Sequence, residues 1–164
     1  MLKKLIILLA LLTIVSGCAS TATSQHDANT VNMQDLAGKT VNIADFKGEK
    51  VYIKFWASWC PICLAGLSEV TTLATQDHDF EVITVVAPGY NNEKQTDDFI
   101  KWFSDVQHVE NLPVWLNEGG NVVEEFNVKG YPTSAFLNTK GELVRSQPGH
   151  LSNDQIIEAM NEID

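Results

Sequence analysis

Two cysteines separated by two residues are the part of this sequence best suited to chemistry. Cys60 and Cys63 lie where a run of strand-forming residues, Val51 to Trp56, gives way to a helical pattern that begins at Pro61. A cysteine at a helix N-terminus faces unpaired N–H groups and the positive end of the helix dipole, which favour the thiolate. One helical turn brings the second sulfur within bonding range. The pattern therefore predicts thiol–disulfide exchange, with Cys60 as an exposed nucleophile and Cys63 as a buried resolving thiol.

Other uses of a C-x-x-C pair fit the sequence less well. Half of a zinc site would need further ligands, but the chain has no second cysteine pair, and His26, His78, His108 and His150 show no ligand spacing. A purely structural disulfide over so short a loop would restrain little of the unfolded chain. We therefore expect no metal and no cofactor beyond a redox-active disulfide between Cys60 and Cys63.

The elements that must position this pair follow from hydrophobic periodicity and turn residues. Strands are predicted at 31–33, 41–43, 51–56, 81–87, 113–116, 133–137 and 142–146, and helices at 61–74, 93–105, 122–126 and 152–160. Strands and helices alternate in the first part, and a hairpin around the turn at 138–141 closes the second. This order predicts an α/β fold with a mixed central sheet flanked by helices.

The first residues have the pattern of an export signal. Lys3 and Lys4 precede an apolar run that is too short to span a membrane comfortably, and small residues lead to Cys18. The string Val15-Ser16-Gly17-Cys18 resembles the bacterial lipobox, which implies cleavage before Cys18 and lipid attachment to its sulfur. We expect a signal peptide at 1–17, a lipidated Cys18 with a flexible tether at 18–30, and one domain at 31–164. The formal net charge of -10 disfavours nucleic acid as a partner.

Several strings resemble the thioredoxin family. Phe55-Trp56-Ala57-Ser58-Trp59-Cys60-Pro61-Ile62-Cys63 and Val128-Lys129-Gly130-Tyr131-Pro132-Thr133 resemble thioredoxin, and Leu36-Ala37-Gly38-Lys39-Thr40-Val41 with Asp45-Phe46-Lys47-Gly48 resembles its TlpA/ResA branch. Within that branch the chain is most similar to the surface thioredoxin lipoproteins of Gram-positive bacteria. The resemblance implies a thioredoxin-like fold with an N-terminal strand extension and a central helical insertion. It also implies an extracytoplasmic oxidoreductase, lipid-anchored to the outer face of the cell membrane.

The same resemblance implies partners and further site residues. Proteins of this kind take electrons from a CcdA-type membrane carrier and pass them to partner proteins such as methionine sulfoxide reductase. Pro132 is expected to follow a cis peptide bond and lie against the cysteine pair, leaving the backbone of Tyr131 free to pair with a substrate chain. Trp59 matches a residue at the rim, and with Pro61 and Ile62 it completes the expected substrate surface. Trp56 is expected in the core.

Two positions depart from the family pattern. Lys54 stands where many members carry Asp or Asn, and Gly66 stands where ResA-like members carry Glu. Burial of Lys54 would disfavour its charged form, and a Lys54 that stayed charged would lower the pKa of Cys63. Alternatively, the Lys54 side chain extends to solvent. Helical spacing turns Glu69 away from the Cys63 face. The sequence thus leaves Cys63 without an identified proton acceptor, with Lys54 as a candidate for tuning its pKa.

Two other functions remain open on the sequence alone. A disulfide-forming oxidase is suggested by Pro61 directly after Cys60, a placement also found in oxidising members. Copper-binding assembly chaperones share the fold but carry a C-x-x-x-C motif and a distant histidine. The spacing between Cys60 and Cys63 is shorter, and His150 has no clear match to that histidine.

A monomer is the expected oligomeric state, and protein disulfides are the expected substrates.

Overall fold

The computed structural model describes residues 31–164, so the predicted signal peptide, Cys18 and the tether lie outside the described residues. The strands are β1 (Met33–Asp35), β2 (Thr40–Val41), β3 (Lys50–Phe55), β4 (Phe80–Val86), β5 (Val114–Leu116), β6 (Thr133–Leu137) and β7 (Leu143–Pro148). The α-helices are α2 (Pro61–Ala65), α3 (Leu67–Ala74), α4 (Thr96–Phe103), α5 (Asn121–Glu125) and α6 (Asn153–Asn161), with 3₁₀ turns η2 (Ile43–Phe46) and η3 (Glu118–Gly120). Within 31–164, no helix has the length and apolar character needed to cross a membrane.

The strands form one mixed sheet in the order β2-β1-β5-β4-β3-β6-β7. The neighbours β3, β4 and β5 run parallel, whereas β6 and β7 on one side and β1 and β2 on the other pair antiparallel. This arrangement confirms the thioredoxin-like fold and its N-terminal strand extension. The strand that leads to the cysteines, β3, lies inside the sheet between β4 and β6, and its residues from Val51 onward are buried.

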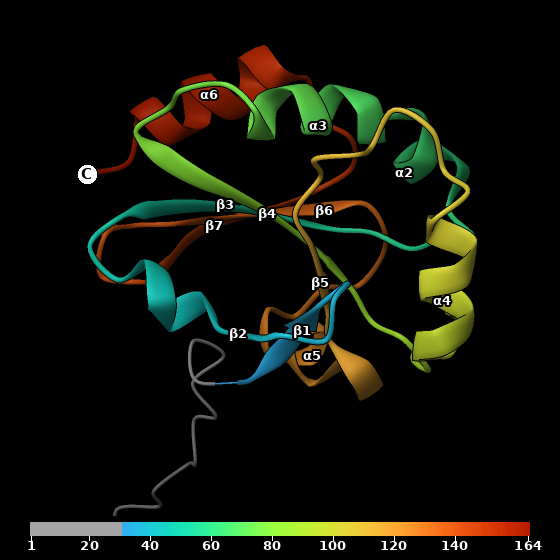
Figure 1. Ribbon diagram of the computed structural model, residues 1–164. Coiled ribbons are helices and arrows are strands. Elements are labelled where there is room, and N and C mark those ends of the chain that lie inside the picture. Colours follow the sequence, from blue (N-terminus) through green and yellow to red (C-terminus); the bar gives the residue numbers. More distant parts are fainter. Residues whose placement is uncertain (1–30) are drawn as a thin grey trace, which may run out of the picture.

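Helices cover both faces of the sheet, as Figure 1 shows. Successive side chains of a strand point to opposite faces. On one face Tyr52 and Trp56 pack with Cys60, Cys63 and the buried sides of α3, α4 and α6. On the other face Ile53 and Phe55 pack against η2 and α5. The cysteine pair therefore belongs to the layer between the sheet and the helices α2, α3 and α6.

Element boundaries differ in several places from the sequence-based expectation, most clearly near residues 42, 66 and 93. The helix expected at 61–74 is interrupted at Gly66, where a Cβ atom would lie 2.9 Å from the ring of His150. The strand expected at 41–43 ends at Val41, because Asn42 caps η2 by accepting a hydrogen bond from the Ala44 N–H. The helix expected from residue 93 begins at Thr96.

Candidate active site

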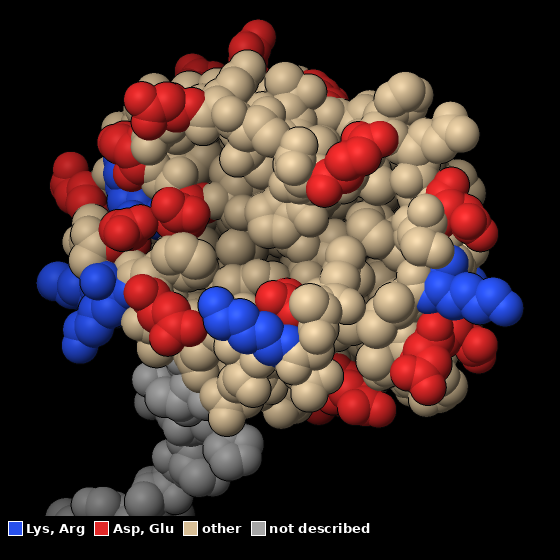
Figure 2. Space-filling view, in the orientation of Figure 1, with Lys and Arg blue, Asp and Glu red and all other residues tan. Residues whose placement is uncertain are grey.

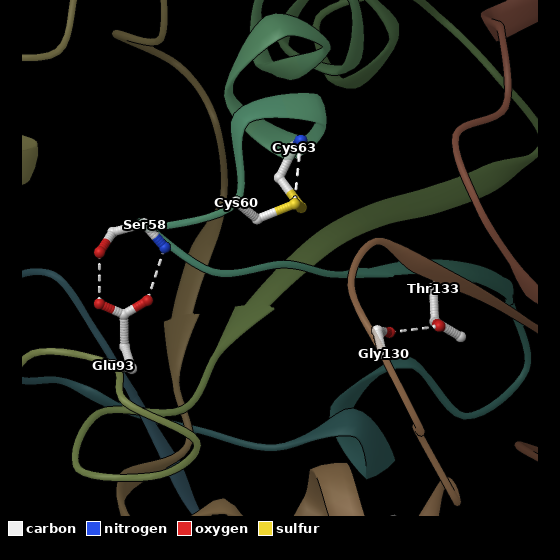
Figure 3. Close-up of a disulfide and its surroundings, with 6 residues drawn as sticks. All are labelled: Ser58, Cys60, Cys63, Glu93, Gly130 and Thr133. Carbon is white, nitrogen blue, oxygen red and sulfur yellow. Dashed lines mark hydrogen bonds between the residues drawn. A yellow bond between two sulfur atoms is a disulfide. The ribbon is translucent and has the colours of Figure 1, made fainter.

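Cys60 occupies the N-cap of α2, as the sequence predicts. Its backbone is extended (φ −94°, ψ 105°), Pro61 opens the helix, and the backbone N–H of Cys63 donates to Cys60 Sγ at 3.2 Å. The two sulfurs form a disulfide (Figure 3). A donor aimed at Cys60 Sγ and the start of a helix both favour a thiolate there once the disulfide is reduced.

The expected exposure of Cys60 is wrong for this oxidised form. Cys60 is 5% exposed and Cys63 is fully buried, so the order of accessibility is as predicted but both residues are covered. The reason is local packing: both cysteines belong to the same buried cluster as Trp56 and Leu67. A substrate reaches this disulfide only at the small exposed part of Cys60.

An exposed apolar rim borders the buried disulfide. Trp59 is 49% exposed and Ile62 is 61% exposed, whereas almost all other large apolar side chains of the described residues are covered. Pro61 between them is also exposed. The ring of Tyr131 meets that of Trp59 edge to face at 5.8 Å, and burial raises the pKa of the Tyr131 hydroxyl to about 12. The predicted substrate residues Trp59, Pro61, Ile62 and Tyr131 therefore share one neighbourhood, and it is apolar.

The peptide bond between Tyr131 and Pro132 is cis, as the family resemblance implies. The loop is held at both ends: the Pro132 carbonyl accepts from the Gly149 N–H at 2.8 Å, and the Thr133 hydroxyl donates to the Gly130 carbonyl at 2.8 Å (Figure 3). Thr133 opens β6 opposite Phe55, the last residue of β3. The loop thus sits beside the strand end from which the chain runs on to the cysteines.

A buried carboxylate that the sequence did not point to supports the cysteine loop. The backbone N–H and the hydroxyl of Ser58 both donate to Glu93, each at 2.5 Å (Figure 3). The Lys94 N–H also donates to Glu93 at 2.8 Å, and the Lys94 ammonium donates to Ser58 Oγ at 2.6 Å. Ser58 and Glu93 are both buried. Because they lie 35 residues apart, no local pattern in the sequence predicts their contact.

Lys54 is buried, so the reading in which it extends to solvent is wrong. The residue is 1% exposed and its Nζ has no hydrogen-bond partner. Burial lowers the pKa of the Lys54 ammonium to about 8, against a smaller opposing effect of the negative charge on Glu69. Glu69 is partly exposed, and its Oε2 lies 3.3 Å from Nε2 of His150. Trp56, by contrast, is fully buried as expected.

The comparisons with known proteins agree with this geometry. Residues 22–161 match the model of the Redoxin family. The chain belongs to that family. An uncharacterised protein of Haemophilus influenzae is 43% identical over 82% of this chain and 86% of its own length. Sporulation thiol-disulfide oxidoreductase A of Bacillus subtilis is 29% identical over 93% of this chain and 92% of its own length.

Among solved structures, the exposed lipoprotein thioredoxin Etrx1 of Streptococcus pneumoniae aligns with a TM-score of 0.77 and 40% identity, over 81% of this chain and 98% of that one. Together with the bonded pair of cysteines, these relatives identify the chain as a thiol–disulfide oxidoreductase of the thioredoxin type. The described residues contain no group of three or more His, Cys, Asp or Glu side chains arranged to hold a metal ion.

Proposed function

We propose that this redoxin is a lipid-anchored, extracytoplasmic reductase in which Cys60 attacks a disulfide of a partner protein and Cys63 resolves the mixed disulfide. The observation that carries the proposal is the position of Cys60 Sγ at the N-cap of α2, where the Cys63 N–H donates to it. In this mechanism the reduced pair donates two electrons, the partner disulfide becomes two thiols, and the pair becomes the disulfide. The dithiol carries the electrons itself, so no other cofactor is required.

The apolar rim supports a protein rather than a small polar molecule as substrate. Trp59, Pro61 and Ile62 are exposed next to Cys60 in the chain, and aromatic and aliphatic side chains of this kind anchor protein contacts. In the proposal the backbone of Tyr131, beside cis Pro132, pairs with the extended substrate segment that carries the disulfide.

Acidic side chains are spread over the face drawn in Figure 2, while uncharged residues occupy its centre. Acidic groups outnumber basic ones in the sequence, which disfavours nucleic acid as a partner.

The cellular part of the proposal comes from the first residues and from the relatives. Cys18 follows a lipobox-like string, and one similar structure is described as an exposed lipoprotein thioredoxin. We accordingly propose a signal peptide at 1–17, a lipidated Cys18 with a tether to residue 30, and a monomeric domain at 31–164. The proposed electron donor is a CcdA-type membrane protein, and methionine sulfoxide reductase is a proposed acceptor.

Trapping of partners tests this function. Cys63→Ala, produced in the full-length chain, should accumulate mixed disulfides on Cys60 that mass spectrometry identifies after non-reducing separation. Cys60→Ala is the matched control and should trap nothing. Captured methionine sulfoxide reductase or a CcdA-type protein supports the proposed partners. Equal trapping by both variants would contradict the assigned roles of the two cysteines. Cys18→Ser should release the protein from membranes.

One observation favours a disulfide-forming oxidase as a second candidate. The Cys63 N–H that points at Cys60 Sγ stabilises a thiolate, and a more stable reduced form makes a dithiol pair more oxidising. The reduction potential separates the two functions. A value near that of thioredoxin, about −270 mV, supports the reductase, whereas a value near about −120 mV supports the oxidase.

A further inference from the structure

Lys54 carries a buried amine that has no part in the exchange between Cys60 and Cys63 described above. Within residues 31–164, Lys54 and Glu93 are the only charged residues that are buried, and Lys54 Nζ makes no hydrogen bond. A buried ammonium without a partner is costly, and the neutral amine avoids most of that cost. Burial lowers the pKa of the Lys54 ammonium to about 8, so an amine with a free lone pair is much more accessible near neutral pH than in an exposed lysine.

The hydroxyls beside Lys54 in the sheet are engaged elsewhere. Thr84 in β4 and Ser134 in β6 both pair in register with Lys54. The Thr84 hydroxyl donates to the Pro113 carbonyl at 3.0 Å, and the Ser134 hydroxyl is bonded to that of Tyr52 at 2.9 Å. Both flanking hydroxyls thus have partners other than the amine.

Strand alternation puts Lys54 on the face of the sheet that holds the disulfide. Tyr52, Lys54 and Trp56 point to the same side of β3, and Tyr52 and Trp56 pack in one buried cluster with Cys60 and Cys63. The chain continues from β3 directly into the loop that ends at Cys60. Lys54 therefore points into the same buried layer, between the sheet and the helices, that holds the disulfide.

Few other groups in this layer can exchange a proton with Lys54. From α3, Glu69 acts on it electrostatically and pairs with His150 in the loop before α6. Burial raises the pKa of Tyr52, so this neighbour stays a neutral phenol. The remaining buried side chains that face the layer from α4 and α6 are apolar: Phe99, Phe103, Ile156, Ala159 and Met160. Among the described residues, the partly exposed Glu69 acts on Lys54 electrostatically, and Cys60 and Cys63 belong to the buried cluster on the same face of the sheet.

We propose that Lys54 accepts the proton of Cys63 when Cys63 resolves the mixed disulfide, an inference that rests on the cysteine roles proposed above. The Cys63 thiol gives its proton to the neutral amine, and the thiolate attacks Cys60 Sγ. The Cys60–Cys63 bond forms, the bond from Cys60 to the substrate sulfur breaks, and that sulfur leaves with the electron pair. The new ammonium then passes its proton to the leaving thiolate or to water. Lys54 is then again a buried group without a hydrogen-bond partner, as in the oxidised structure.

The two half-reactions can be watched separately with 5,5′-dithiobis(2-nitrobenzoate) as the disulfide. With Cys18 replaced by Ser to remove the third thiol, the reduced protein should release one nitrothiobenzoate when Cys60 attacks and a second when Cys63 resolves. In Lys54→Met the second phase should slow at least about tenfold at neutral pH while the first stays within about twofold, because only the second needs the acceptor. Lys54→Asp, which restores an ionisable acceptor, should recover much of the second phase.

Lys50→Met is the matched control for these variants. Lys50 lies on the same strand but pairs with Asp79 near the surface, 2.8 Å away, so its removal should leave both phases unchanged. A second phase in Lys54→Met that stays within about twofold of wild type between about pH 6 and pH 9 overturns the inference. So does an equal slowing in Lys54→Met and Lys54→Asp, since packing alone would explain it. Absence of the first phase from the wild-type protein contradicts the proposed function itself.

The titration of the Cys63 thiol tests the same inference without turnover. In a Cys18→Ser, Cys60→Ala background, Cys63 is the remaining cysteine, and the absorbance of its thiolate near 240 nm reports its titration. Replacing Lys54 with Met or Gln should raise the pKa of Cys63 by about one unit or more, because the thiolate loses the ammonium that balances it. An unchanged Cys63 titration in either folded variant overturns the inference.

Discussion

The buried charged residues Glu93 and Lys54 differ in their hydrogen bonding. Glu93 accepts three hydrogen bonds, from the Ser58 N–H, the Ser58 hydroxyl and the Lys94 N–H. Lys54 makes none. A buried charge that is fully hydrogen-bonded holds its neighbours in place, whereas one without partners is free to change its protonation. The carboxylate thus supports the loop, and the amine is available for chemistry.

Removal of Glu93 should have the largest effect on stability. Glu93→Ala leaves the buried N–H and hydroxyl of Ser58 without their acceptor and the Lys94 ammonium without the nearby negative charge. Loss of one partner of a buried charged network costs about 3–5 kcal/mol, measured here by urea unfolding of the oxidised protein. The exposed Glu124→Gln is the control and should change little. If Glu93→Ala changed stability no more than this control, the carboxylate would not be a support.

Removal of Lys54 should stabilise the folded protein, whereas removal of Glu93 should destabilise it. Its pKa of about 8 in the folded protein is below the ordinary value of 10.5, so between these values the unfolded chain binds more protons and stability rises with pH. Below pH 8 the folded protein bears the full cost of the buried charge, about 3 kcal/mol from a shift of this size. Lys54→Met should therefore stabilise the oxidised protein at pH 7, by an amount that falls to about 1 kcal/mol near pH 10. A destabilised Lys54→Met at every pH would contradict the description of Lys54 as an unpaired buried base.

Ser58→Ala should destabilise the folded protein less than Glu93→Ala does. This change removes the hydroxyl but keeps the backbone N–H that donates to Glu93 at 2.5 Å. We expect a cost of about 1–2 kcal/mol, measured by the same unfolding experiment, because one of the three bonds to the carboxylate is lost. A cost as large as that of Glu93→Ala would mean that the hydroxyl, and not the carboxylate as a whole, holds the loop.

Glu69→Gln should have the smallest effect, and it should be seen at Lys54. The negative charge of Glu69 raises the pKa of the Lys54 ammonium, so its removal should move the Lys54 titration to lower pH. The chemical shift of Cε in lysine-labelled protein reports this titration by NMR. Glu69 is partly exposed, and solvent weakens its influence. A shift to higher pH would contradict the assigned electrostatics.

The parts of the site that follow from local sequence were predictable. The Cys60 N-cap, the Pro61 helix start and the strand before them depend on residues next to one another, and the structure confirms them. The cis bond before Pro132 followed from family resemblance, since periodicity carries no such information. Sequence reasoning could not place contacts set by packing at a distance: Ser58 with Glu93, and His150 over Gly66, where the helix breaks. It also left open whether Lys54 is buried, because a lysine in a strand can extend to solvent or stay inside.

The reactivity of the Cys60 thiol tests the account most directly. In reduced Cys18→Ser, Cys63→Ala protein, the rate of alkylation by iodoacetamide should follow the thiolate fraction of Cys60 as pH is varied. The account predicts a midpoint below about pH 7.5, because the start of α2 and the backbone N–H of residue 63 stabilise the thiolate. A midpoint near about 8.5, the value of an ordinary cysteine, would contradict it.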